Sequence, residues 1–217
     1  MKVFIGYDSR EKEAYDVAVR SILRYNKYLE VRPIVKGHMK AYGFDREDDK
    51  GSTEFTLTRF LTPYLAAYQG HALFMDCDVL VQTDLEQILE EADLDKAVSC
   101  VQHDYTPKSN FKMDGQQQHV YPRKNWSSVM LFNCAHPLVK QNLTLGAVCE
   151  QSPKYLHRME WAEDSIGSLH HTWNYLSGYY TDLEVPNIIH YTDGGPWFDE
   201  YKHCQFAEEW RKAQNTS

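Results

Sequence analysis

Three absences in the 217-residue sequence narrow what this protein can be. No apolar run approaches the roughly 20 residues that a membrane-spanning helix needs, so we expect no integral membrane segment. Positive charge is scarce, and the formal net charge of −8 argues against a nucleic-acid-binding protein that is held by phosphate contacts. No Cys-x-x-Cys pair occurs among the five cysteines, which indicates reduced thiols in the cytoplasm and not a disulfide framework.

What is present fits one globular domain that spans residues 1–217. Strand and helix patterns alternate from the N-terminus, with a strand over residues 3–7, a helix over 12–25 and a second strand over 29–35. Pro33 indicates an edge position for the second strand, because proline cannot donate a main-chain hydrogen bond. This order predicts an α/β domain with a mainly parallel central sheet flanked by helices.

Similar patterns continue along the rest of the chain. We expect further helices over residues 53–68, 85–92, 138–150 and 201–214, and further strands over 73–75, 97–102, 125–133 and 185–191. The polar segment 36–54 predicts a long surface loop, either a functional lid or a disordered insert. Segment 105–124 is irregular, and the acidic segment 160–167 can open a helix.

The most informative stretch is residues 73–81, where Asp76 and Asp78 interrupt an apolar run. Apolar residues on both sides indicate a strand that is buried on both faces. Ionised carboxylates need a partner there, because desolvation costs several kcal/mol per charge. Mn²⁺ or Mg²⁺ would be such a partner, since these cations bind carboxylate oxygens together with substrate phosphates. A strand that ends in a solvated Asp-Cys-Asp turn is the alternative on this motif alone.

Polar groups also follow other predicted strands. In open α/β sheets, ligands bind outside the carboxyl ends of the strands. Imidazole binds Mn²⁺ as well as softer ions, so His190 is a reasonable third ligand beside the two carboxylates. The polar groups at the strand ends are Tyr7-Asp8, Asp76-Asp78, His103-Asp104 and His190.

Six motifs then occur in a fixed order between residues 3 and 198. They are Ile5-Gly6-Tyr7-Asp8 with Tyr15, Leu57-Thr58-Arg59-Phe60, Asp76-Cys77-Asp78, the strand from Trp126 to Asn133, Asp164-Ser165, and His190-Tyr191 through Pro196-Trp197. Their order and spacing resemble glycosyltransferase family 8. That family comprises retaining enzymes with a GT-A fold, among them glycogenin and bacterial lipopolysaccharide galactosyl- and glucosyltransferases.

The resemblance implies transfer of a sugar from a nucleoside diphosphate donor, a UDP-sugar, to a glycan or other acceptor, with retained configuration. It implies Mn²⁺ or Mg²⁺ as cofactor and Asp164 as the catalytic residue, so that Asp164→Asn should abolish transfer. The implied site residues are Asp76, Asp78 and His190 for the metal, Tyr7, Asp8, Tyr15, Arg59 and Cys77 for the nucleotide, and Asp104, Ser127, Ser128 and Asp164 for the donor sugar or the acceptor.

Three motifs depart from the family pattern. The family's Asn-Ser-Gly reads Trp126-Ser127-Ser128, a serine at 165 replaces glutamine, and Gly195 replaces the lysine that would hold the diphosphate. Other groups would have to bind that phosphate. The candidates are Arg59, Lys124 and the main-chain N–H groups of Gly194 and Gly195.

Two other functions stay open at this point. A non-catalytic protein that binds nucleotide sugars or glycans would fit the missing lysine and glycine. A nucleotidyltransferase that makes sugar nucleotides would need a glycine-rich N-terminal loop, and only Gly6 is present there.

Overall fold

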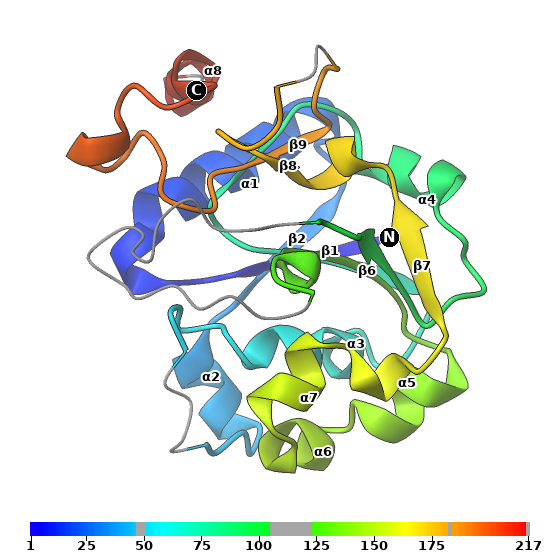
Figure 1. Cartoon of the computed structure of the whole chain (residues 1–217). Helices are drawn as coiled ribbons and strands as arrows, with labels where there is room; N and C mark the ends of the chain where they lie inside the picture. Colours follow the sequence, from blue (N-terminus) through cyan, green and yellow to red (C-terminus); the bar gives the residue numbers. More distant parts are fainter. Residues whose placement is uncertain (47–50, 105–122, 182–183, 216–217) are drawn as a thin grey trace.

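The computed structural model describes residues 1–46, 51–104, 123–181 and 184–215 (Figure 1). A six-stranded sheet in the order β2-β1-β3-β6-β5-β7 forms its centre. The strand pairs are parallel except those of β6, which runs against the other five. This confirms the predicted α/β class and the mainly parallel sheet. The strands are β1 Lys2–Gly6, β2 Glu30–Ile34, β3 His71–Met75, β5 Val98–Val101, β6 Val129–Asn133 and β7 Ile166–Leu169.

A smaller sheet, in the order β4-β9-β8, lies beside the first. Its strands are β4 Val79–Val81, β8 Tyr175–Leu176 and β9 Ile188–His190. Three residues separate the end of β3 from the start of β4. The chain therefore leaves the large sheet at Asp76 and enters the small sheet at Val79, where we had expected one buried strand. The two carboxylates lie where the two sheets meet.

The apolar residues of β1 and β3 suit the interior positions of these strands in the large sheet. Val3, Phe4, Leu73 and Phe74 are all at most 1% exposed. Strand β2 lies at the edge, as Pro33 predicted, because an edge strand leaves one row of main-chain groups without a neighbouring strand.

Helix α1, Lys12–Tyr25, has the predicted bounds. It buries Ala14, Val17, Ala18 and Ile22 along one face, as expected for an amphipathic helix. This helix contacts both β4 and the C-terminal helix α8, Ala207–Gln214. Figure 1 shows α1, the small sheet and α8 on one side of the large sheet.

A layer of short helices covers the other side of the large sheet in Figure 1. It consists of α2 Lys36–Ala41, α3 Thr62–Leu65, α5 Pro137–Asn142, α6 Leu145–Glu150 and α7 Pro153–His157. Helix α4, Ile88–Glu91, follows the small-sheet strand β4. Among the described residues, no helix combines the length and the apolar character that crossing a membrane requires.

Several predicted helices are shorter than expected. The segment 53–68 contains only a 3-10 turn, Thr58–Leu61, followed by α3. Residues 138–150 form two helices, because Thr144 caps the second by accepting a hydrogen bond from the Ala147 N–H. The expected helix over 85–92 is a 3-10 turn, Leu85–Gln87, followed by α4. The C-terminal helix begins at Ala207 and not at 201.

Two predictions about loops and helix starts were wrong. The segment 36–54 begins with α2, whose Met39 is buried, so this part is no surface loop. The acidic segment 160–167 forms only a 3-10 turn, Glu160–Ala162, and then enters strand β7, since Glu163 has a positive φ of 50° that ends the helical backbone. Residues 47–50 and 105–122 of the two predicted loops lie outside the described residues.

Candidate metal and nucleotide site

The strand register decides which residues meet at one edge of the large sheet. Met75 pairs with Val129, the first residue of β6, so Asp76 continues from that edge. The antiparallel pairing of β5 with β6 and the parallel pairing of Val101 with Leu169 place the carboxyl ends of β5 and β7 at the same edge. Ligands bind at such edges in open α/β sheets.

The three predicted metal ligands lie together at this edge. One ligand atom from each of Asp76, Asp78 and His190 lies within 4.8 Å of the other two. Asp78 is 6% exposed and His190 is 2% exposed. The Nε2 atom of His190 lies 3.4 Å from Oδ1 of Asp78. Two carboxylates and one imidazole fit a divalent cation such as Mn²⁺ or Mg²⁺.

Arg59 is held against one of these carboxylates. Its Nη1 donates to Oδ1 of Asp76 and to the Ser127 carbonyl, at 2.8 Å in each case. Its guanidinium lies over the rings of Phe55 and Phe74, at 5.1 and 5.2 Å from the ring centroids. Arg59 therefore supports Asp76, although the sequence predicted that it binds the nucleotide.

Gly6 is required by the packing of Phe55 beneath Arg59. A Cβ atom at this position would come within 2.3 Å of the Phe55 ring. Glycine is therefore needed for the close approach of Phe55, which in turn packs against Arg59. This accounts for a lone glycine where the sequence has no phosphate-binding loop.

Two predicted nucleotide contacts, Tyr7 and Tyr15, form an edge-to-face pair with ring centroids 5.3 Å apart. The third, Asp8, is fully buried. Burial alone would raise its pKa, but hydrogen bonds from Arg10 and from the Glu54 N–H outweigh burial and hold the pKa below its ordinary value. In this structure the Asp8 carboxylate thus stabilises its own loop.

Cys77 lies between the two aspartates and is fully buried. Its Sγ lies 3.8 Å from Oε2 of Glu11. Burial, followed by the charge of Glu11, raises the pKa of the thiol well above its ordinary value. A nucleotide contact from Cys77 would therefore come from its main chain.

Ser127 and Ser128 are buried within a hydrogen-bond network. The Ser127 hydroxyl lies 2.9 Å from Nδ1 of His157. The Ser128 hydroxyl donates to the Asn125 carbonyl at 2.7 Å and lies 2.9 Å from Nδ2 of Asn174. The sequence analysis missed both His157 and Asn174, since neither belongs to a motif with a recognisable spacing.

Asp104 follows β5 at the site edge, and its side chain is exposed. His103 beside it is buried, with Nδ1 2.7 Å from the Tyr180 hydroxyl. Burial, the largest cause, lowers the pKa of His103 to about 3. A neutral imidazole therefore lies next to Asp104.

Asp164 lies away from these residues. It is exposed and precedes β7, whose first residue, Ile166, pairs with Val98 at the start of β5. Strand β7 is four residues long, or roughly 13 Å at about 3.3 Å per residue. The structure thus places Asp164 at the opposite edge of the large sheet from Asp76, Asp78 and His190, whereas the predicted catalytic role would require it beside them.

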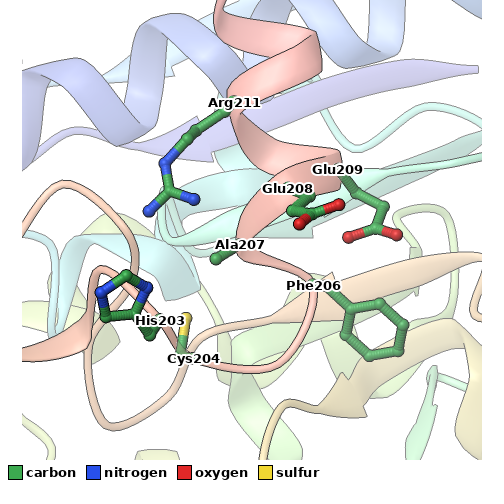
Figure 2. A pocket seen from close by; sticks show the side chains of 7 residues that line it. All are labelled: His203, Cys204, Phe206, Ala207, Glu208, Glu209 and Arg211. Carbon is green, nitrogen blue, oxygen red and sulfur yellow. The ribbon is translucent and has the colours of Figure 1, made fainter.

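A surface hollow of about 310 Å³ lies around the start of α8 (Figure 2). Glu208 and Glu209 lie to one side of it and Arg211 to the other. None of the three candidate metal ligands lines this hollow. Its lining residues are His203, Cys204, Phe206, Ala207, Glu208, Glu209 and Arg211.

Comparison with known proteins gives the family. No family model matches the chain. The chain is 46% identical to Protein CDI of Arabidopsis thaliana, in a match that covers 96% of this chain and 84% of that protein. The chain belongs to the Protein CDI family.

Solved structures give the fold of this CDI-family chain. Its full length matches the glycosyltransferase GlyE of Streptococcus pneumoniae TIGR4 with a TM-score of 0.65 at 19% identity. The chain spans 60% of the GlyE chain. Its full length also matches 97% of the galactosyltransferase LgtC, solved with donor and acceptor sugar analogues, with a TM-score of 0.61 at 17% identity. These matches confirm the GT-A fold.

Proposed function

We propose that this CDI-family protein is a metal-dependent glycosyltransferase of the family 8 type. It transfers a sugar from a UDP-sugar to a glycan or other acceptor and retains the anomeric configuration. The observation that supports this most is the cluster of Asp76, Asp78 and His190 where the two sheets meet. The GT-A fold and the donor and acceptor analogues bound by LgtC also support it.

The chain's own residues would hold and orient the donor. Asp76, Asp78 and His190 bind the cation, and Arg59 fixes the carboxylate of Asp76 through a 2.8 Å ion pair. Mn²⁺ or Mg²⁺ would neutralise the charge that develops on the leaving diphosphate. The Tyr7 ring, which packs against another tyrosine, gives the nucleoside an aromatic contact.

The contacts around Gly195 also indicate which group could bind the diphosphate in place of the family's lysine. A side chain at Gly195 would place its Cβ 2.0 Å from the Trp197 ring, so lysine does not fit there. Arg59 is bound to a carboxylate, and the Gly194 N–H donates to the Tyr191 carbonyl. We therefore propose the Gly195 N–H as one phosphate contact, and Lys124 stays a candidate from the sequence motif alone.

The catalytic role that the resemblance gave to Asp164 is not part of this proposal, because Asp164 lies at the other edge of the sheet. Asp104, at the end of β5, remains the proposed contact to the donor sugar or acceptor. Retention would then follow from attack on the leaving-group face, with the departing phosphate oxygen as the base.

Calorimetric titration of UDP tests the proposal. Wild-type protein should bind UDP with Mn²⁺ and lose most of this affinity in EDTA, whereas Asp78→Ala should show no metal-dependent binding. Incubation with a panel of UDP-sugars and Mn²⁺ should then release UDP. Metal-independent binding, or none, would contradict the proposal.

A non-catalytic nucleotide-sugar-binding protein is the second candidate. Gly195 in place of lysine favours it, as does the distance of Asp164 from the site. Metal-dependent UDP binding without UDP release from any donor would support this candidate.

We also propose that the chain acts as one domain and is cytoplasmic, in keeping with its free thiols at Cys77, Cys100 and Cys134.

A further inference from the structure

The metal-ligating histidine has a buried amide behind it. Nδ1 of His190 lies 2.9 Å from Oδ1 of Asn174, which is fully buried. Either nitrogen of a neutral imidazole can carry the hydrogen, and the partner of one nitrogen decides which. The orientation of the Asn174 amide therefore determines which nitrogen can bind a cation.

The far end of that amide faces two acceptors. Nδ2 of Asn174 lies 3.2 Å from the Asn125 carbonyl and 2.9 Å from the Ser128 hydroxyl oxygen. A carbonyl can only accept, and the Ser128 hydroxyl already donates its hydrogen to the same Asn125 carbonyl at 2.7 Å. The NH₂ group must therefore point toward Asn125, which leaves the amide oxygen facing His190.

An amide oxygen can only accept, so Nδ1 of His190 carries a hydrogen, and in the neutral imidazole Nε2 then carries the lone pair. That lone pair lies 3.4 Å from Oδ1 of Asp78. Two acceptors that face each other repel unless a cation lies between them. We propose that Asn174 is a positioning residue that holds His190 in the Nδ1–H tautomer and presents Nε2 to the metal.

Ser128 connects this network to the other ligand strand. Its carbonyl accepts a hydrogen bond from the Asp76 N–H at 2.8 Å, while its hydroxyl accepts from Asn174. One serine therefore helps to orient both Asp76 and, through Asn174, His190. Glycine, which stands here in the family that the motifs resemble, would lack this hydroxyl.

The metal part of this inference rests on the proposed function, but the tautomer is a property of the metal-free protein. Two-dimensional ¹⁵N NMR of the histidine side chains, in EDTA, reads it directly. We expect a protonated Nδ1 and an unprotonated Nε2 for His190 in the wild type, with the peak assigned by its loss in His190→Gln. In Asn174→Ala this preference should be lost.

Mn²⁺ affinity, followed by electron paramagnetic resonance of the free ion, gives the second measurement. We expect Asn174→Ala to bind Mn²⁺ about 10- to 100-fold more weakly than the wild type, the range known for lost partners of ligating histidines. Ser128→Gly should weaken binding less, since it leaves the Asn174–His190 hydrogen bond in place. Asn142→Ala is the matched control, because it removes an amide hydrogen bond to the Trp161 carbonyl in the helical layer.

The outcomes separate this inference from the proposed function. A wild-type His190 with hydrogen on Nε2, or an Asn174→Ala variant with unchanged Mn²⁺ affinity, would overturn the role of Asn174. If wild-type protein binds no Mn²⁺ while the NMR shows the Nδ1–H tautomer, the proposed metal chemistry fails and the positioning contact stands. Should Asn174→Ala not fold, the wild-type spectrum still decides the tautomer.

Discussion

At the scale of single residues, Arg59 shows how a buried charge supports Asp76, a candidate metal ligand. It forms a 2.8 Å ion pair with Asp76, and both side chains are less than one-seventh exposed. A lone buried carboxylate would be strongly disfavoured, so the ion pair offsets part of the cost of burying Asp76. The same arginine also donates to the Ser127 carbonyl, which connects the residues just before β6 to the candidate metal site.

The exposed Asp164 and the buried Asp78 allow a direct comparison of two acidic residues at opposite edges of the large sheet. Because Asp164 is exposed at the edge away from the metal ligands, we expect Asp164→Asn to change kcat/KM for sugar transfer by less than about threefold, or below roughly 0.7 kcal/mol. Asp78→Asn, which alters a buried ligand, should lower it at least about 100-fold. An inactive Asp164→Asn variant that still folds and binds UDP would restore the catalytic role implied by the resemblance.

His157 couples stability to pH. Burial, followed by the charge of Arg59, lowers its pKa from 6.5 to about 3. The unfolded chain therefore takes up a proton at higher pH than the folded protein does. The stability due to this difference is complete above pH 6.5 and is lost as the pH falls toward 3.

We therefore expect His157→Gln to flatten the pH dependence of the unfolding free energy by up to about 1.4 kcal/mol per pH unit between about pH 6 and pH 4. Urea unfolding of metal-free protein at several pH values measures this slope. The exposed His38 gives the matched control, His38→Gln. Equal slopes for His157→Gln and the wild type would show that His157 is protonated normally in the folded protein.

At the scale of elements, helix α8 supports the small sheet that carries His190. Trp210 is 2% exposed and packs in one cluster with Val17 of α1, Leu80 of β4 and Ile189 of β9. Large-to-small changes in such clusters remove contacts and leave a cavity. The C-terminal helix is therefore a structural part of the site's support, although it lies away from the ligands.

We expect Trp210→Ala to lower the unfolding free energy by about 3–5 kcal/mol. Chemical unfolding followed by circular dichroism measures the change. Tyr28→Ala serves as the control, because Tyr28 is 86% exposed and its loss should cost less than about 0.5 kcal/mol. A similarly small effect of Trp210→Ala would mean that α8 does not pack on the small sheet in solution.

At the scale of the whole molecule, the candidate metal site joins the two sheets. Asp76 follows β3 of the large sheet, and His190 ends β9 of the small sheet. A cation bound to both would stabilise the folded protein and connect the sheets, since the unfolded chain does not hold these ligands together.

We expect Mn²⁺ at about 100 times its dissociation constant to add roughly 2.7 kcal/mol to the unfolding free energy. For a chain of this size, Tm should rise by about 5–10 °C. Thermal scans with Mn²⁺, and again after EDTA, measure the shift, which Asp78→Ala should abolish. An equal rise in Asp78→Ala would place the bound ion elsewhere on the protein.

The sequence by itself determined the α/β class, the full extent of α1 and the edge position of β2, and it singled out Asp76, Asp78 and His190, which the structure brings together. Each of these rests on short-range patterns: helical spacing in α1, the missing donor of Pro33, and polar residues directly after apolar strands. Such patterns can be recognised without the strand order, because ligands of open α/β sheets bind beside the residues that follow the carboxyl ends of the strands.

Only the tertiary structure decided the rest. Strands β3 and β4 look continuous in the sequence but belong to different sheets, because pairing with β6 and β9 is a long-range choice. Asp164 lies at the edge of the sheet away from Asp76, Asp78 and His190, because it precedes β7 and β7 runs parallel to β5. Asn174 also could not be predicted from the sequence. It contacts His190, 16 residues away, and the direction of this hydrogen bond depends on Asn125 and Ser128. No local sequence pattern encodes these contacts.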